Sequence, residues 1–195
     1  MKQHWRPGTM LSPLPAAIIT ACNQRGESNL FTASWTGILN SDPPMCYVSI
    51  RPERYSYPMV KETMQFAINL TTAAMAKATD LVGVTSGRNG DKWASSGLTP
   101  CKAKIVDCPL VAESPVSLEC QVREIMPLGS HDLFIADIVS VAVDDAYINP
   151  QTGKLDLKKS NLLVYAHGEY FTLGDFAGYF GWSVKKGSDP IERRD

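Results

Sequence analysis

Residues 16–50, AAIITACNQRGESNLFTASWTGILNSDPPMCYVSI, contain three short apolar segments separated by the polar turn sequences NQRGES and NSDPP. The apolar segments are AAIITAC (16–22), NLFTASWTG (29–37) and MCYVSI (45–50). Short segments with β-branched and aromatic residues, joined by turns of this kind, are typical of β-hairpins. The stretch therefore predicts consecutive β-strands that pair antiparallel.

Four further segments have the composition of strands, and one of them alternates strictly. In VSLECQVREI the apolar residues fall on one face, whereas Glu119 and the other polar residues fall on the opposite face. This period of two is the pattern of a half-buried strand. The four segments are QFAINL (65–70), VSLECQVREI (116–125), HDLFIADIVSVAVD (131–144) and NLLVYAHGEYFTL (161–173).

Helical signals are few. TTAAMAKATDLVGV (71–84) changes to a helical period, with Thr72 able to cap it, and a short helix is expected to begin near Ser56. The polar, glycine-rich TSGRNGDKWASSG (85–97) is expected to form an irregular loop. Because successive strands follow one another without helices between them, we expect a mainly β fold: an antiparallel sheet closed into a barrel or sandwich, with helices outside it.

The chain of 195 residues is long enough for one well-buried core, so we expect a single domain spanning residues 1–195. Its polar tail, about 183–195, is expected to be mobile or to lie at a dimer contact. With 19 basic and 20 acidic residues the net charge is -1, which favours neither nucleic acid nor a membrane surface as a partner. No membrane span or signal peptide is visible, so we expect a cytoplasmic protein.

Several familiar site motifs are absent. The sequence lacks G-x-G-x-x-G, G-x-x-x-x-G-K-[ST] and G-x-S-x-G, and its five cysteines form no C-x-x-C pair. No metal motif is found, and the only nucleophile left open is a Cys/His pair brought together by the fold. Any nucleotide must therefore be held without a glycine-rich nucleotide fold.

The junction SIRPERYSYPMV (49–60) combines Arg51 and Arg54 with a helix start near Ser56. Two fixed positive charges beside a helix start form a plausible site for a single phosphate. The alternative is that both arginines are solvated loop charges and that Ser56 only caps the helix.

Two other segments share this mixture of polar and aromatic residues. NLFTASWTG places Trp35, with hydroxyl and amide side chains, in one strand and its exit, and SGRNGDKW places Lys92 and Trp93 after a flexible loop. Taken alone, each has a plain structural explanation: core packing for Trp35 and a solvated loop charge for Lys92.

Together, these stretches resemble the flavin reductase-like FMN-binding family, the split-barrel flavoproteins that include flavoredoxin and the flavin-reducing partners of two-component monooxygenases. The resemblance runs from about Pro13 to Gly174. It implies an antiparallel split β-barrel that binds FMN. The segments that carry it, in the family's order, are FTASWTGILNSDPPMCYVSI, RPERYSYPMV, QFAINL, SGRNGDKW, SPVSLECQV, GSHDLFIADIV and YFTLG.

The resemblance also implies residues around the flavin ring. In such proteins the strand matching TASW lies along the isoalloxazine, with backbone amides bonding its pyrimidine edge. The matching positions here are Ala33, Ser34 and Trp35, with Asn29 as a further polar contact. His131, in GSHDLF, matches the histidine that family members place at the barrel mouth near the flavin and the nicotinamide, and is the expected catalytic residue.

At the other end of the flavin, the resemblance implies that Arg51, Ser56 and Lys92 meet the phosphate. The last strand often lends an aromatic residue to the site in this family. Here that residue is Tyr165 or Tyr170, because the register of the strand is not fixed by the sequence. Each of the two tyrosines also has a plain explanation as a core aromatic.

The function implied is that of a redox flavoprotein in which non-covalently bound FMN accepts a hydride from NADH or NADPH. One alternative is a flavoredoxin-like electron carrier that receives electrons from a protein partner, and another is a flavin-free binding module on the same barrel. Family members are usually homodimers. The apolar segment DFAGYFGW (175–182) could supply such an interface, or could cover the barrel within one chain.

Overall fold

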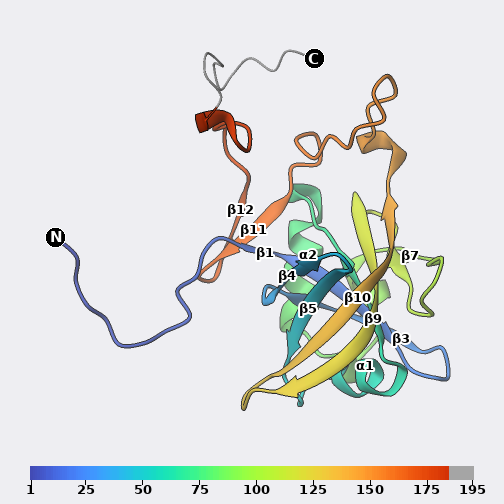
Figure 1. Cartoon of the computed structure of the whole chain (residues 1–195). Helices are drawn as coiled ribbons and strands as arrows, with labels where there is room; N and C mark the ends of the chain where they lie inside the picture. Colours follow the sequence, from blue (N-terminus) through green and yellow to red (C-terminus); the bar gives the residue numbers. More distant parts are fainter. Residues whose placement is uncertain (185–195) are drawn as a thin grey trace.

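The computed structural model describes residues 1–184, and its centre is a seven-stranded sheet in which every neighbouring pair is antiparallel (Figure 1). The strand order is β3-β2-β6-β9-β10-β5-β4. The prediction of a mainly β, antiparallel fold is confirmed. The strands are β2 (Ala17–Cys22), β3 (Ser28–Ala33), β4 (Thr36–Ser41), β5 (Pro44–Ile50), β6 (Gln65–Asn69), β9 (Val116–Pro127) and β10 (Asp132–Val143).

The sheet curls so that the end of one edge strand reaches the start of the other. β3 and β4 lie at opposite ends of the strand order, yet only Ser34 and Trp35 separate them along the chain. The backbone N–H of Ser49, on β5, donates to the carbonyl of Trp35 at 2.9 Å. The strand and exit expected over residues 29–37 are β3 and a bend at Ser34 and Trp35, where the chain crosses from one edge of the sheet to the other, and residues 36–37 already belong to β4.

Alternate side chains of the strands fill the interior of the curled sheet. On β5, Cys46, Val48 and Ile50 are buried, while the residues between them are partly exposed. These three pack with Phe66 of β6 and Phe134 of β10 in one apolar cluster. Burial of large apolar side chains from five or more strands supplies the main stabilisation of the sheet.

The outer face of β9 differs from the predicted half-buried pattern at Glu119, which is 1% exposed. Its carboxylate accepts backbone N–H bonds from Lys104 (3.0 Å), Ile105 (2.6 Å) and Val106 (3.0 Å). Burial raises the pKa of this carboxyl, but the three N–H donors outweigh burial and hold the pKa below its ordinary value. The loop can cover Glu119 because the carboxylate accepts hydrogen bonds from the backbone N–H groups of the loop.

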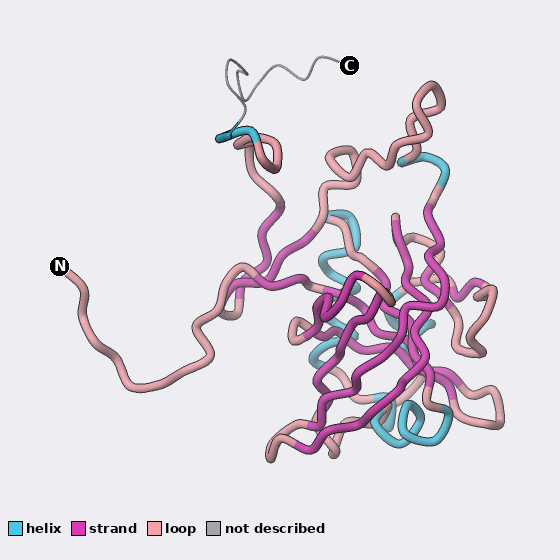
Figure 2. The backbone as a smooth tube through the Cα atoms, in the orientation of Figure 1, coloured by secondary structure: helices cyan, strands magenta, loops and turns pink. Residues whose placement is uncertain are grey.

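The helices lie around the sheet (Figure 2). The expected helix near Ser56 is present as α1, and the expected helix over 71–84 is a 3₁₀ turn, η1, followed by α2, which packs on Ile18 and Leu30. Residues 85–97 are more regular than predicted, because the Asp91 side chain caps a third helix. The elements are α1 (Tyr57–Thr63), α2 (Ala76–Val84), α3 (Lys92–Ser96), η1 (Ala73–Met75), η2 (Gly87–Asn89), η3 (Asp145–Tyr147) and η4 (Trp182–Val184).

A small second sheet projects from the body, together with the N-terminal segment (Figure 1). The single last strand predicted over 161–173 is two strands, because His167 and Gly168 adopt φ values of 47° and 93° and turn the chain back. The remaining short strands are β1 (Leu14–Pro15), β11 (Leu163–Ala166) and β12 (Glu169–Thr172) in this sheet, and β7 (Pro100–Cys101) and β8 (Leu110–Val111) in a two-stranded ladder.

Two expectations concern the ends and the outside of the molecule. The tail predicted over 183–195 lies, from residue 185 onward, outside the described residues. Within residues 1–184, no helix has the length and apolar character needed to cross a membrane.

Candidate functional site

Two cavities of about 410 Å³ and 340 Å³ lie next to each other where β3 meets the segment that joins β5 to α1. The first cavity is closed on its other side by the segment joining α2 to α3, and the second is bordered by the bend after β3, the start of β10 and β11. Phe31, Arg51 and Arg54 line both cavities. An elongated ligand can therefore occupy both, and each volume lies within the range of small-molecule sites.

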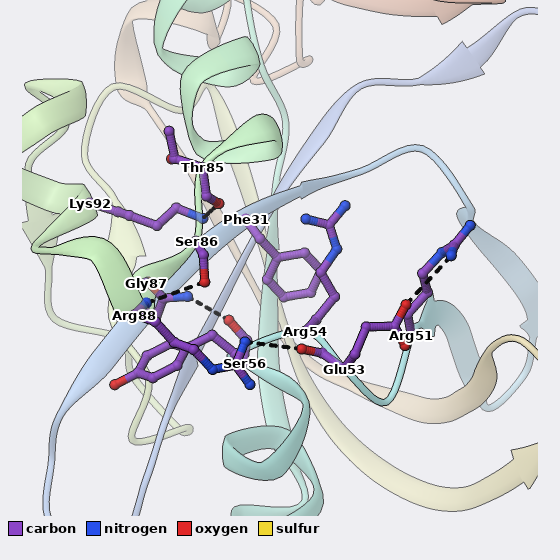
Figure 3. Close-up of a pocket in the computed structure, with 12 residues that line it drawn as sticks. Phe31, Arg51, Glu53, Arg54, Ser56, Thr85, Ser86, Gly87, Arg88 and Lys92 are labelled. Carbon is purple, nitrogen blue, oxygen red and sulfur yellow. Dashed lines mark hydrogen bonds and ion pairs between the residues drawn. The ribbon is translucent and has the colours of Figure 1, made fainter.

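The first cavity is cationic. Arg51, Arg54, Arg88 and Lys92 line it, and Glu53 is the only carboxylate among its described lining residues (Figure 3). Backbone carbonyls hold two of the arginines: Arg54 Nη1 donates to Gly83 at 3.1 Å, and Arg88 Nη1 to Glu53 at 3.2 Å. Guanidinium groups fixed in this way suit a phosphate or another compact anion.

Lys92 is the first residue of α3, and its side chain is buried, with 4% exposed. Its Nζ donates to the carbonyls of Val82 (2.5 Å) and Thr85 (3.2 Å) at the end of α2. Burial, aided by the charge of Arg54, lowers the pKa of Lys92 to about 8. An ammonium has three donors, and no third partner for Nζ is found among the described residues, so one N–H is available to a ligand in the cavity.

Asn29 and Ser56 form the polar floor of the first cavity. Asn29 Nδ2 donates to Ser56 Oγ at 2.7 Å, and both side chains are buried. Gly87 packs closely above them: a Cβ added there would lie 2.4 Å from Tyr55 Cδ1 and 2.8 Å from Asn29 Oδ1. The absence of a side chain at residue 87 therefore lets the α2–α3 segment close over this floor.

Gly87→Ala is expected to disturb the cavity without unfolding the protein. Because the new methyl group would clash with both Tyr55 and Asn29, the segment must move outward by a few tenths of an ångström or more. We expect affinity for an anionic ligand to fall about tenfold, with a loss of about 1–2 kcal/mol in unfolding free energy. Ligand titration and urea denaturation would measure both effects. Gly26→Ala is the stability control, because Gly26 has a positive φ but lies outside the cavity, so this variant should lose stability and keep its affinity for the ligand. Unchanged ligand affinity in Gly87→Ala would contradict the expectation.

The second cavity is aromatic and polar. The rings of Trp35 and His131 lie with their centroids 4.5 Å apart, tilted at 43°. Trp35 is 39% exposed, so it is not the core residue that its size alone suggests. Ser130 Oγ lies 2.9 Å from His131 Nδ1. Burial lowers the pKa of His131, and Arg51 lowers it further, which favours the neutral imidazole.

Tyr165 reaches the second cavity from the projecting sheet. Its neighbour Tyr170 packs edge-on against it, with ring centroids 5.9 Å apart, and donates to Asp80 Oδ1 at 3.3 Å. Of the two tyrosines that the sequence offered for the site, the structure thus places Tyr165 at the cavity and Tyr170 behind it.

All nine site residues predicted from the sequence line one or both cavities, although they come from five parts of the chain. Those at the first cavity are Asn29, Arg51, Ser56 and Lys92. Those at the second are Ala33, Ser34, Trp35, Arg51, His131 and Tyr165.

Some lining residues escaped prediction, notably Phe31, Ser86 and Arg88. Arg88 lies between two glycines, a position typical of a loop that could approach the junction 49–60. The sequence does not show which way that loop folds, so Arg88 could not be assigned to the site. The alternative reading of Lys92 as a solvated loop charge does not hold, because its ammonium is buried.

Comparison with known proteins places these cavities in context. A family model described as "Flavin reductase like domain" matches residues 10–174. The flavoredoxin of Desulfovibrio vulgaris (Miyazaki F) is 31% identical, with 95% of this chain and 100% of that chain covered and a TM-score of 0.88. For the flavoredoxin of Methanosarcina acetivorans the identity is 27%, the coverage 95% and 100%, and the TM-score 0.84. The FMN reductase (NADH) RutF of Enterobacter cloacae is 24% identical over 72% of this chain and 82% of its own length.

Proposed function

The chain belongs to the flavin reductase-like family, and from this premise we propose that it is a redox flavoprotein that binds FMN non-covalently across the two joined cavities and takes a hydride from NADH or NADPH. The observation that carries the proposal is the union of a cationic cavity with an aromatic one through Phe31, Arg51 and Arg54. FMN has the matching asymmetry, with a phosphate at one end and a flat ring at the other.

The residues present fit the phosphate end. Lys92 is a buried ammonium with one unused donor, and Arg54 and Arg88 flank it with guanidinium groups already held by carbonyls. Ser56 adds a hydroxyl at the cavity floor. Because these cations are fixed before any ligand enters, little side-chain entropy is lost when an anion binds. This arrangement supports a dianionic phosphate better than a neutral group.

The residues at the second cavity fit a flat, partly polar ring. Ala33 ends β3, and Ser34 and Trp35 form the bend between β3 and β4, so backbone N–H groups at this bend can bond a ring edge. When bound, FMN would supply the hydride acceptor. We assign to His131 the role of a neutral imidazole beside that ring, held by Trp35 on one side and Ser130 on the other.

Affinity for FMN is expected to fall as the pH rises above about 8. Before FMN binds, Lys92 has a pKa of about 8, so above that pH its neutral amine must take up a proton before it can bond a phosphate dianion as an ammonium. Between about pH 7 and 7.5 the affinity should be nearly constant, since the phosphate is mostly a dianion and Lys92 is mostly an ammonium. Calorimetric titration in buffers of different ionisation enthalpy would detect proton uptake near pH 8.5. Equal affinities at pH 7.5 and pH 9.5 would contradict a role for the Lys92 charge.

Trp35 emission is expected to be quenched when FMN binds, because the indole lines the cavity assigned to the ring. Trp35→Phe should remove most of the quenching while leaving a folded protein. Fluorescence titration with FMN checks this. If Trp35→Phe shows undiminished quenching, the effect belongs to another tryptophan such as Trp93, and the ring is not beside Trp35.

The absorption spectrum of the protein as isolated, followed by anaerobic addition of NADH and then NADPH, tests the proposed reaction. We expect a yellow protein, or one that turns yellow with added FMN, and bleaching of the flavin band by at least one nicotinamide. A colourless protein that fails to take up FMN would exclude the proposal. The same outcome would leave the flavin-free binding module as the remaining function.

A second candidate is a flavoredoxin-like electron carrier that receives electrons from a protein partner. It is favoured by the two flavoredoxins, which match 95% of this chain and all of their own length. A carrier should hold FMN yet be reduced by nicotinamides many times more slowly than by a protein reductase. The rate of anaerobic bleaching separates the two functions.

We also propose a homodimer, supported by apolar side chains that are exposed in the segment 175–182. Phe176, Phe180 and Trp182 lie within the segment 175–182 and are more than one third exposed. Exposed apolar groups gathered in this way usually mark a contact surface. Size-exclusion chromatography with light scattering should give twice the mass of one chain, and a strict monomer would contradict the dimer.

A further inference from the structure

Arg51 differs from the other cations of the first cavity in its position. Like Arg54, it lines both cavities, but it lies farther from Lys92. Figure 3 shows its guanidinium on the opposite side of the first cavity from Lys92, with Arg54 and Phe31 between them. A phosphate held by Lys92 would therefore meet Arg54 before it met Arg51.

Arg51 also differs in how it is held. Arg54, Arg88 and Lys92 each donate to backbone carbonyls, which fixes their charges in place. The partner found for the Arg51 guanidinium among the described residues is Glu53, with 3.5 Å between Nη1 and Oε1. These side chains are 51% and 67% exposed, and an ion pair between exposed side chains contributes little because solvent screens it. An incoming anion can therefore separate this pair at little cost.

The charge of Arg51 faces the space over the aromatic cavity. It is close enough to His131 to help lower the pKa of that imidazole, and it lines the second cavity together with Trp35. Its partner Glu53 lines the first cavity, so the pair Arg51–Glu53 lies where the two cavities adjoin. A second ligand that entered beside a ring bound over Trp35 would pass this pair.

Building on the proposed reductase function, we infer that Arg51 binds a phosphate of the nicotinamide dinucleotide rather than the phosphate of FMN, and that Glu53 competes with this phosphate for the guanidinium. The pair Arg51–Glu53 then sets the affinity for the second substrate. The chemistry recognised is a phosphoester. NADH and NADPH both offer it in their pyrophosphate, and NADPH offers it again at the 2′ position.

Titration of the FMN-loaded protein with the oxidised nucleotides NAD⁺ and NADP⁺ tests this without turnover. In Arg51→Gln we expect binding of NADP⁺ to weaken about tenfold, because one charge-assisted hydrogen bond is lost, with the Kd for FMN within about twofold of wild type. In Glu53→Gln we expect binding of NADP⁺ to tighten about two- to threefold, because the competing carboxylate is gone. Arg25→Gln, in the β2–β3 turn, removes one positive charge outside both cavities and should change nothing.

The two phosphate sources give different patterns, and each supports the inference. A loss for NADP⁺ alone assigns Arg51 to the 2′-phosphate, whereas equal losses for NAD⁺ and NADP⁺ assign it to the pyrophosphate. Reduction of bound flavin by a phosphate-free donor, 1-benzyl-1,4-dihydronicotinamide, should proceed at the same rate in wild type and Arg51→Gln.

Two results would overturn the inference while leaving the proposed function intact. One is unchanged nucleotide binding in Arg51→Gln. The other is a tenfold weaker affinity for FMN in that variant, which would return Arg51 to the flavin phosphate. If wild-type protein holds FMN but neither binds nor is reduced by any nicotinamide, the reductase function itself fails, and the assignment of Arg51 fails with it.

Discussion

Lys92→Met is expected to bind FMN about tenfold to a hundredfold more weakly than wild type, the range expected for loss of one charge-assisted hydrogen bond to phosphate. The substitution keeps an unbranched chain in the buried position but removes the ammonium that faces the cavity. It also takes a donor from the carbonyls of Val82 and Thr85, so the end of α2 is expected to loosen. Fluorescence titration with FMN measures the affinity.

Riboflavin and a second lysine supply the controls for this variant. Riboflavin lacks the phosphate, so its affinity should fall far less than that of FMN. Lys77→Met changes an exposed lysine on α2 and should leave both affinities unchanged. An FMN affinity that survives in Lys92→Met, or an equal loss for riboflavin, would show that the ammonium acts only through the fold.

Glu119→Ala is expected to lower the free energy of unfolding by about 3–5 kcal/mol, because it leaves one buried and two partly buried N–H groups without an acceptor. These groups belong to the loop over β9, at Lys104, Ile105 and Val106. The folded pKa of Glu119 is held low, so its contribution is present above the ordinary value of 4.5 and is lost as the pH falls through the folded value. Urea denaturation measures the loss at pH 7.

Glu124→Ala is the matched control, since Glu124 lies on the same strand with its side chain exposed. It should change the free energy of unfolding by about 0.5 kcal/mol or less. If the two variants are equally stable, the bonds from Glu119 to the loop contribute nothing measurable. A loss in Glu119→Ala that is the same at pH 3 as at pH 7 would show that the charge of the carboxylate is not what matters.

The strands were predictable because apolar period and turn residues are local signals. VSLECQVREI and HDLFIADIVSVAVD appear as β9 and β10, and the helix start at Ser56 follows its sequence signal. These local signals do not predict the order of the strands in the sheet. The sequence predicts a strand and its exit over residues 29–37, but it does not show that the chain crosses at Ser34 and Trp35 to the opposite edge of the sheet.

The burial of Glu119 shows a second limit. A period of two predicts which residues share a face, but not what covers that face. The loop over residues 104–106 comes from a part of the chain without regular structure, and it converts an outer polar position into a buried one. A carboxylate between apolar neighbours gave no hint that three N–H donors would meet it.

The sequence predicted which residues belong to the candidate site better than it predicted how they are arranged. Order and spacing of the family's segments identified Lys92 and Arg51 together, as if both met one phosphate. The structure places them at opposite sides of the cavity and buries only Lys92. The direction of the Lys92 side chain depends on Asp91, which caps α3 and so places Lys92, the first residue of this helix, next to the end of α2. That tertiary contact has no signature in the sequence.

The central claim is that the cationic cavity holds a phosphate while the adjoining aromatic cavity holds the ring of the same ligand. Parallel titration of the flavin-free protein with FMN and with riboflavin at pH 7.5 tests it most directly. The expected result is saturable binding of one FMN per chain, with a Kd about a hundredfold or more below that of riboflavin, as two charge-assisted hydrogen bonds would give. Equal affinities for FMN and riboflavin, or no binding of either, would contradict it.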